Sequence, residues 1–160
     1  MPRILLPIDG SPDALDAVRH ALALRAEGLA ISAVLLNVQE PPHLYEVVLA
    51  PDAELIEEAS HEAGEHALDA ARHLLDAAGV EHDSLVVTGD PAHQIAEQAA
   101  LQGCDLIVMA TLSHGALLGR LQDSVSHAVV RHSRTPVLLV PHVEPEVDAE
   151  DLAALADVDD

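Results

Sequence analysis

The 160 residues suit one compact domain, and nearly half of them are apolar, which is enough to build a core. Twenty-eight acidic residues stand against seven basic ones, all arginine, so the formal net charge is −21 and the surface repels phosphate backbones and anionic lipid. The chain has one Tyr and no Phe or Trp, so it also lacks the aromatic platforms that stack bases, and neither nucleic acid nor a membrane is an expected partner.

The first predicted unit is a strand, a turn and a helix. Residues 3–8 form a short apolar run, and the turn Asp-Gly-Ser-Pro at 9–12 follows. Ser11 is suited to cap a helix whose first position is Pro12, and the helix ends near Gly28. Its apolar face comprises Leu15, Val18 and Leu22.

The second unit repeats this order with a longer helix. Residues 31–38 are apolar on both faces of the predicted strand, as buried parallel strands are. A loop with three prolines covers 39–52, and a long helix is predicted over 53–78, with Gly79 at its end. The stripe of this helix predicted to be buried comprises Ile56, Ala59, Ala63, Ala67, Ala70 and Leu74.

The third and fourth units complete the alternation. Residues 84–87 and 105–110 are predicted strands, and between them Gly-Asp-Pro at 89–91 begins a helix that turns Ile95 and Ala99 inward. A loop with two glycines covers 111–120, then come a helix over 121–132 and a strand over 136–140. The inward residues of that last helix are predicted to be Leu121, Val125, Ala128 and His132.

Residues 143–160 are predicted to be a disordered acidic tail, because the segment from Glu144 carries eight acids and no base. The preceding residues, 1–142, form the folded domain. Strict alternation of apolar strands and helices predicts an α/β fold, a doubly wound parallel sheet with helices on both faces. Ligands of such folds bind beyond the carboxyl ends of the strands, where the strand order reverses.

Four segments, taken together, resemble the universal stress protein family. They are Ile-Leu-Leu-Pro-Ile-Asp-Gly-Ser-Pro at 4–12, Thr-Gly-Asp-Pro-Ala at 88–92, Cys-Asp-Leu-Ile-Val-Met at 104–109, and Asp-Ser-Val-Ser at 123–126 with Thr-Pro-Val-Leu-Leu-Val at 135–140. The resemblance implies a stress-response protein with a five-stranded sheet of order 3-2-1-4-5, like the adenine-nucleotide α-hydrolase folds. It also implies a nucleotide cleft between the first and fourth strands and a homodimer through the last strand, Val137–Val140.

The same resemblance implies which residues would hold ATP or AMP. They are Pro7, Ile8, Asp9, Val38, Met109, Ala110, Ser113, Ser124 and Val125. Asp9 would contact the ribose or a bound Mg²⁺. The alternative reading of Asp9 is a turn residue at a strand end, without a ligand.

The phosphate-binding loop departs from the family pattern. ATP-binding members carry G-x2-G-x9-G-[S/T] after the fourth strand, and Ala110, Ser113 and Asp123 stand at the three glycine positions, while the hydroxyl of Ser124 is kept. Glycines there let backbone amides approach phosphate oxygens. The carboxylate of Asp123 opposes a second anion at a helix start and is itself a good helix cap.

A different reading of this loop keeps phosphate binding. Gly115 and Gly119 lie nearby, and His114 or Arg120 would supply positive charge. The leading hypothesis is therefore a dimeric, non-enzymatic stress-response protein with a degenerate nucleotide cleft that acts through unknown protein partners. The alternatives are an ATP- or AMP-dependent switch and a slow ATP hydrolase that uses Asp9.

Other chemistry has weaker support in the sequence. His66, His73 and Asp69 lie on the long helix without metalloprotease spacing, and exposed helical histidines are expected there, so no metal site is predicted. Cys104, in an apolar run, is expected to be buried and inert. There is no nucleophile elbow, and no signal peptide or membrane-length apolar segment, so a cytoplasmic location is expected.

Overall fold

The computed structural model describes residues 1–41, 53–111 and 125–141. In these ranges the chain forms a five-stranded parallel sheet of order β3-β2-β1-β4-β5, which confirms the predicted fold class and strand order. The strands are β1 Arg3–Pro7, β2 Ser32–Gln39, β3 His82–Thr88, β4 Leu106–Thr111 and β5 Val137–Pro141. The helices are α1 Ala14–Ala26, α3 Ala53–Ala77, α4 Pro91–Leu101 and α5 Val125–His132. Each predicted strand is present, with its ends shifted by one or two residues.

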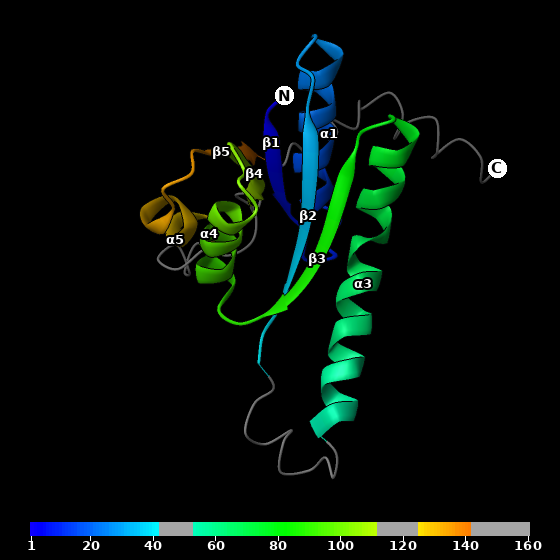
Figure 1. Ribbon diagram of the computed structural model, residues 1–160, viewed down its shortest axis with the longest axis vertical. Coiled ribbons are helices and arrows are strands. Elements are labelled where there is room, and N and C mark those ends of the chain that lie inside the picture. Colours follow the sequence, from blue (N-terminus) through cyan, green and yellow to red (C-terminus); the bar gives the residue numbers. More distant parts are fainter. Residues whose placement is uncertain (42–52, 112–124, 142–160) are drawn as a thin grey trace, which may run out of the picture.

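The sheet is covered on both faces, by α1 and α3 on one side and by α4 and α5 on the other (Figure 1). Successive residues of each inner strand enter opposite cores. Leu6 and Leu35 belong to the core under α1 and α3, whereas Leu5 and Leu36 belong to the core under α4 and α5. Because both faces are buried, β1 and β2 are apolar at consecutive positions, as parallel strands require.

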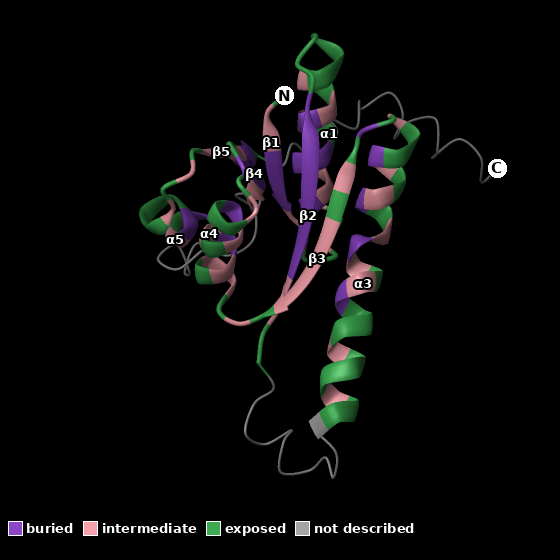
Figure 2. Ribbon diagram, in the orientation of Figure 1, coloured by how far each residue is buried: buried purple, intermediate pink, exposed green. Residues whose placement is uncertain are grey.

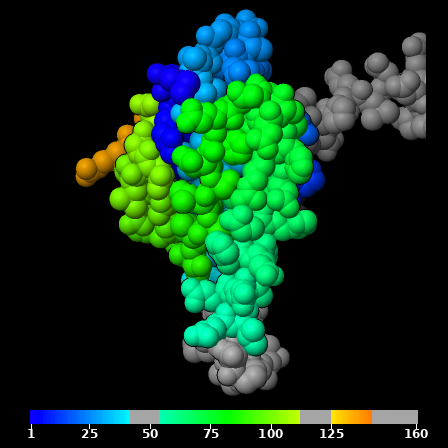
Figure 3. Space-filling view, turned by 45° about the vertical axis from the view of Figure 1, so that its right-hand side comes forward, coloured from blue at the N-terminus to red at the C-terminus, as the bar shows by residue number. Residues whose placement is uncertain are grey.

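The buried face of α3 differs from the predicted stripe. Leu68, Ala71 and Leu75 are fully buried, whereas Ala59, Ala63 and Ala70 are exposed. The two stripes lie side by side on the helix, and the one with two leucines removes more apolar surface from water. The first half of α3 extends past the sheet and is largely exposed (Figures 2 and 3).

The buried face of α5 also differs from the prediction. Ser126 and Val129 are buried, whereas Val125 and His132 are exposed and Ala128 is half-buried. Val129 lies in the core under α4 and α5, where a valine covers more apolar surface than an alanine does. The predicted inward residue Leu121 lies outside the described residues.

The start of α1 is a third correction. The helix begins at Ala14, with Asp13 at the cap position, and Ser11 and Pro12 belong to the preceding turn. Ser11 does not cap the helix as predicted because its hydroxyl donates to Asp9 Oδ1 at 2.6 Å and accepts only a long bond of 3.4 Å from the Ala14 amide. The equivalent prediction for α4 is confirmed, since the Asp90 side chain accepts from the His93 amide at 2.9 Å.

Candidate functional site

The carboxyl ends of β1, β2 and β4 lie at one edge of the sheet. Pro7 pairs with Leu36 of β2, and Leu5 pairs with Ile107 of β4. Because the strands are parallel, this register brings the ends of all three to the same place. The order of the chain reverses between β1 and β4, so this edge is also the switch point at which such sheets bind ligands.

The predicted site residues on or directly after β1, β2 and β4 lie at this edge, but they present different groups to it, whereas Val125 begins α5. Ile8 and Met109 are buried and pack into opposite cores, so their side chains contact other core residues and are not exposed to a ligand. Pro7, Val38 and Ala110 are half-buried. Apolar atoms of these three residues and the exposed carboxylate of Asp9 are therefore what the edge offers to a ligand.

Asp9 lies directly after β1 and shapes the turn that follows. Its Oδ1 accepts a hydrogen bond from the Ser11 amide at 2.9 Å and from the Ser11 hydroxyl at 2.6 Å. Among the described residues, no hydrogen bond engages Oδ2 of Asp9. Asp9 is thus a turn residue, and it keeps one carboxylate oxygen that can accept from a ligand hydroxyl.

The turn after β1 packs against α3. Gly10 has φ +88°, and a Cβ atom there would lie 3.2 Å from Cβ of Ala67. Glycine therefore serves two needs at this position, a left-handed backbone and a close approach to the helix. The distance between the turn and α3 leaves little freedom for Asp9 to move toward the helix.

Asn37 is a residue of the site that sequence reasoning missed. It is 2% exposed, and its Nδ2 donates to the carbonyl oxygen of Ile8 at 2.8 Å. The Ile8 amide in turn donates to the Leu36 carbonyl at 2.8 Å, so both backbone groups of Ile8 are bound. The signal was present in the sequence as a lone Asn within the apolar run 31–38, where a buried amide needs partners.

A cavity of about 480 Å³ lies beside this edge, over α4 and α5. Of the predicted site residues within the described ranges, only Val125 lines it. The acidic residues Glu40 and Asp90 line it together with His93 and His132. Two carboxylates oppose an anionic ligand, so we place the candidate site at the strand ends and not in this cavity.

Three predicted positions lie outside the described residues. They are Ser113, Asp123 and Ser124, and the four residues of the alternative loop reading, His114, Gly115, Gly119 and Arg120, lie outside them as well. The hypothesis that Asp123 occupies the space of a polyphosphate therefore remains a prediction.

The histidines of α3 are on its surface. His66 Nδ1 lies 3.2 Å from Asp69 Oδ2, and the His66 side chain is largely exposed. His73 Nδ1 lies 2.7 Å from the Asp69 carbonyl oxygen. In residues 1–41, 53–111 and 125–141 no three His, Cys, Asp or Glu residues gather as metal ligands do.

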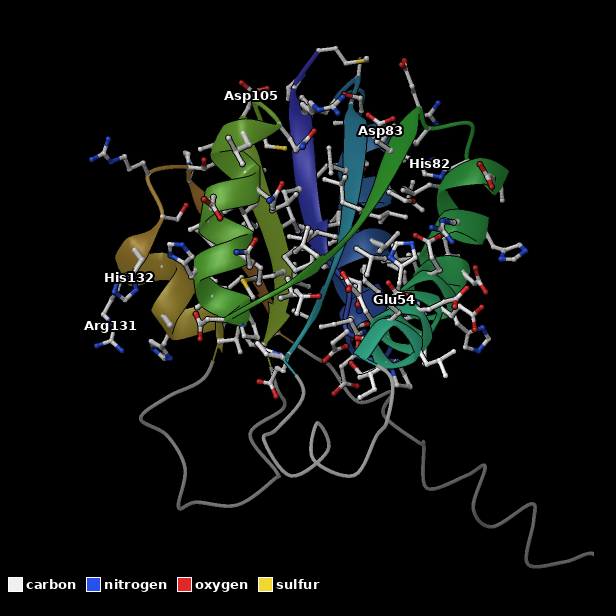
Figure 4. All side chains as sticks on the ribbon, turned by 60° about the horizontal axis from the view of Figure 1, so that its bottom comes forward. Glu54, His82, Asp83, Asp105, Arg131 and His132 are labelled. Carbon is white, nitrogen blue, oxygen red and sulfur yellow. The ribbon has the colours of Figure 1, made fainter. Side chains whose placement is uncertain are left out.

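Cys104 lies at the other edge of the sheet, away from the candidate site. The thiol is buried, as expected, and burial raises its pKa, while the nearby Arg3 guanidinium lowers it by a smaller amount. Asp83 and Asp105, which bind Arg3, mark this edge in Figure 4. A neutral buried thiol is a poor nucleophile, so Cys104 is a core residue.

No helix within the described ranges has both the length and the apolar character needed to cross a bilayer.

Comparison with known proteins finds relatives that all belong to one family. A family model described as the universal stress protein family matches residues 1–141. Universal stress protein MJ0531 of Methanocaldococcus jannaschii is 32% identical over 146 residues, which cover 90% of this chain and 84% of that protein. A universal stress protein solved in complex with cAMP is 26% identical, with a TM-score of 0.67 over 89% of this chain and 98% of that one. A universal stress protein family protein from Arabidopsis thaliana with AMP bound has a TM-score of 0.66 at 20% identity, over 95% and 99% of the two chains.

Proposed function

The chain belongs to the universal stress protein family, and from that premise we propose that it is a non-enzymatic binding protein for an adenosine monophosphate. In this proposal the cleft at the ends of β1, β2 and β4 keeps the part that holds a nucleoside and has lost the part that holds a polyphosphate. The observation that carries the proposal is the contrast between the Asp9 turn, which is formed and retains an acceptor, and the altered glycine positions of the phosphate loop.

The nucleoside part of the proposed cleft is made of described residues. Oδ2 of Asp9 would accept a hydrogen bond from a ribose hydroxyl, while Oδ1 stays bound to Ser11. The half-buried side chains of Pro7 and Val38 offer apolar surface to a purine ring. The positions of these groups at one edge support a ligand with a sugar and a flat apolar base.

The phosphate part of the proposed cleft is argued from sequence and charge. Ala110, Ser113 and Asp123 replace three glycines, so backbone amides there are less able to approach phosphate oxygens. The chain also carries a net charge of −21, which opposes ATP more than it opposes a ligand with a single phosphate. The relative solved in complex with cAMP provides a family precedent for a ligand of that class.

Calorimetric titration with AMP, cAMP and ATP plus Mg²⁺ tests the proposal. We expect micromolar binding of AMP or cAMP and binding of ATP that is at least about tenfold weaker. Tighter binding of ATP than of AMP would contradict the loss of the polyphosphate site. Turnover of ATP by the purified protein would favour the alternative of a slow hydrolase, with Asp9 at its centre.

We also propose that two copies of the chain associate through β5. This strand is an edge of the sheet, and Val137, Leu138 and Leu139 are only half-buried in the single chain. An apolar edge strand gains from being covered by a second copy. Sedimentation analysis over a range of concentrations tests this, and a monomer at high concentration would contradict it. Magnesium binding at Asp9, the protein partners and the cytoplasmic location stay predictions.

A further inference from the structure

A chain of side-chain hydrogen bonds connects α3 to the turn that carries Asp9. The Ser60 hydroxyl on α3 donates to Gln39 Oε1 at 3.4 Å. Gln39 Nε2 donates to Asn37 Oδ1 at 2.6 Å, and Asn37 Nδ2 donates to the carbonyl oxygen of Ile8 at 2.8 Å. We call the three side chains of Asn37, Gln39 and Ser60 the amide relay. It ends one residue before Asp9.

The direction of every bond in the amide relay follows from its last acceptor. The Ile8 carbonyl can only accept, so Asn37 must present its NH2 group there, and its Oδ1 faces Gln39. Gln39 must then present its own NH2 group to Asn37, which leaves Oε1 for the Ser60 hydroxyl. A change at one member therefore forces the next amide to turn or to lose its bond.

α3 also contacts the turn and the relay directly. Gly64 lies so close to β2 and β3 that a Cβ atom would be 2.8 Å from Asn37 Oδ1 and 2.5 Å from Cγ1 of Val86. Three residues further along α3, Ala67 lies against Gly10 of the turn. The helix thus limits both Asn37 and the turn after β1, and neither has space to move toward it.

We propose that Asn37 is a positioning residue for ligand binding, and that the amide relay sets the Asp9 turn relative to α3. Asn37 is buried and offers no surface to a ligand, so it acts through the Ile8 carbonyl. A buried amide in an apolar strand is costly unless its hydrogen bonds are made, and here one bond is donated to the Ile8 carbonyl before the turn and the other is accepted from Gln39. The inference rests on the proposed nucleotide site for its effect on affinity.

The first variant to test is Asn37→Asp, which keeps the shape of the side chain. The carboxylate still accepts from Gln39, but it places an oxygen against the Ile8 carbonyl in place of a donor. We expect AMP affinity to fall about tenfold, the equivalent of one hydrogen bond. We also expect faster amide hydrogen exchange in a peptide covering residues 8–14, measured without any ligand.

The second variant is Gln39→Glu, which changes the relay one hydrogen bond further from the Asp9 turn. Gln39 is half-buried, so the fold tolerates a charge there better than at the buried Asn37. A carboxylate oxygen against Asn37 Oδ1 favours rotation of the Asn37 amide, and that rotation removes the donor from the Ile8 carbonyl. The matched control is Gln98→Glu, which adds the same charge to α4, in the layer on the other face of the sheet. We expect Gln39→Glu to weaken AMP binding and to speed exchange at 8–14, and Gln98→Glu to change neither.

The readouts separate this inference from the proposed function. If the wild-type protein binds neither AMP nor cAMP, the proposed function fails, and exchange at 8–14 alone decides the positioning role. If the wild-type protein binds AMP and a folded Asn37→Asp or Gln39→Glu variant binds within twofold of it, with unchanged exchange, the positioning role is wrong. Circular dichroism establishes that each variant is folded at the temperature of the titration.

Discussion

Arg3 Nη2 lies 2.6 Å from Asp83 Oδ2, so the first side chain of β1 reaches across β2 to β3. The Arg3 amide also donates to Asp105 Oδ2 at 2.8 Å, immediately before β4. The hydrogen bond to Asp83 is the main cause of a raised Arg3 pKa, and desolvation opposes it. Because a raised pKa in the folded state favours the charged guanidinium, the contribution of the Arg3 charge to stability is fully present at neutral pH and falls as the pH rises through strongly alkaline values.

We expect Asp83→Asn to lower the free energy of unfolding by about 0.5 to 1 kcal/mol. The value is small because the Asp83 side chain is 65% exposed and water screens the charges. Urea denaturation at low and at high salt measures it. The difference between wild type and variant should shrink at high salt. A difference that does not depend on salt would show that the ion pair is not its source.

The corrected face of α3 is tested by two leucines of the same helix. We expect Leu68→Ala to cost about 2 to 5 kcal/mol, because the side chain is fully buried and its removal leaves a cavity. Leu55→Ala, at a position that is 62% exposed, should change stability by less than about 0.5 kcal/mol. Chemical denaturation gives both values, and equal effects would contradict the assigned face.

Gly64→Ala sets helix propensity against packing. Alanine gains about 1 kcal/mol over glycine in a helix, but overpacking a core costs about 1 to 3 kcal/mol. The new methyl would lie 2.5 Å from Cγ1 of Val86, a half-buried β-branched side chain with a stiff χ1, so we expect net destabilisation. Ala63→Gly, at the exposed neighbouring position, measures the propensity alone. A more stable Gly64→Ala protein would show that α3 can move off the sheet.

Asp123→Gly tests the proposed loss of the polyphosphate site. Removing the carboxylate takes away a negative charge and restores the glycine of the family pattern. We expect ATP affinity to rise about tenfold while AMP affinity changes little. Glu58→Gln, at an exposed position of α3, removes the same charge and controls for net charge. Calorimetry with both nucleotides gives the answer, and an unchanged ratio of affinities would remove Asp123 from the explanation.

The raised pKa of the Cys104 thiol predicts that the free energy of unfolding decreases as the pH rises in the alkaline range. Burial raises its pKa in the folded protein, so the unfolded chain releases the thiol proton first as the pH rises. Stability is therefore complete below the ordinary thiol pKa and falls as the pH rises from there toward the folded value. Urea midpoints across the alkaline range measure this for wild type and Cys104→Ala. A fall of equal size in both would exclude the thiol as its cause.

Local patterns predicted the elements of this fold well because the information lies in neighbouring residues. Buried parallel strands are apolar runs, and each of the five predicted runs is a strand, including β3, in which no residue is fully buried. Asp90 followed by Pro91 is a complete helix start, and it caps α4. Asp9, Ser11 and Pro12 resemble it, but there the Ser11 hydroxyl binds Asp9 and the helix starts later. The Ser11 hydroxyl can either cap the helix or bind Asp9, and the spacing of the residues in the sequence does not distinguish these two arrangements.

By itself the sequence determined the alternation of strands and helices, and the family motifs in it pointed to the edge at which a ligand would bind. Only the tertiary structure decided which stripe of α3 and α5 is buried, because that choice depends on the apolar area each stripe can cover on the assembled sheet. The same holds for Asn37, whose partners are a carbonyl 29 residues earlier and an amide two residues later. The sequence shows that a buried amide needs hydrogen-bond partners, but only the packing of the folded chain determines which groups those partners are.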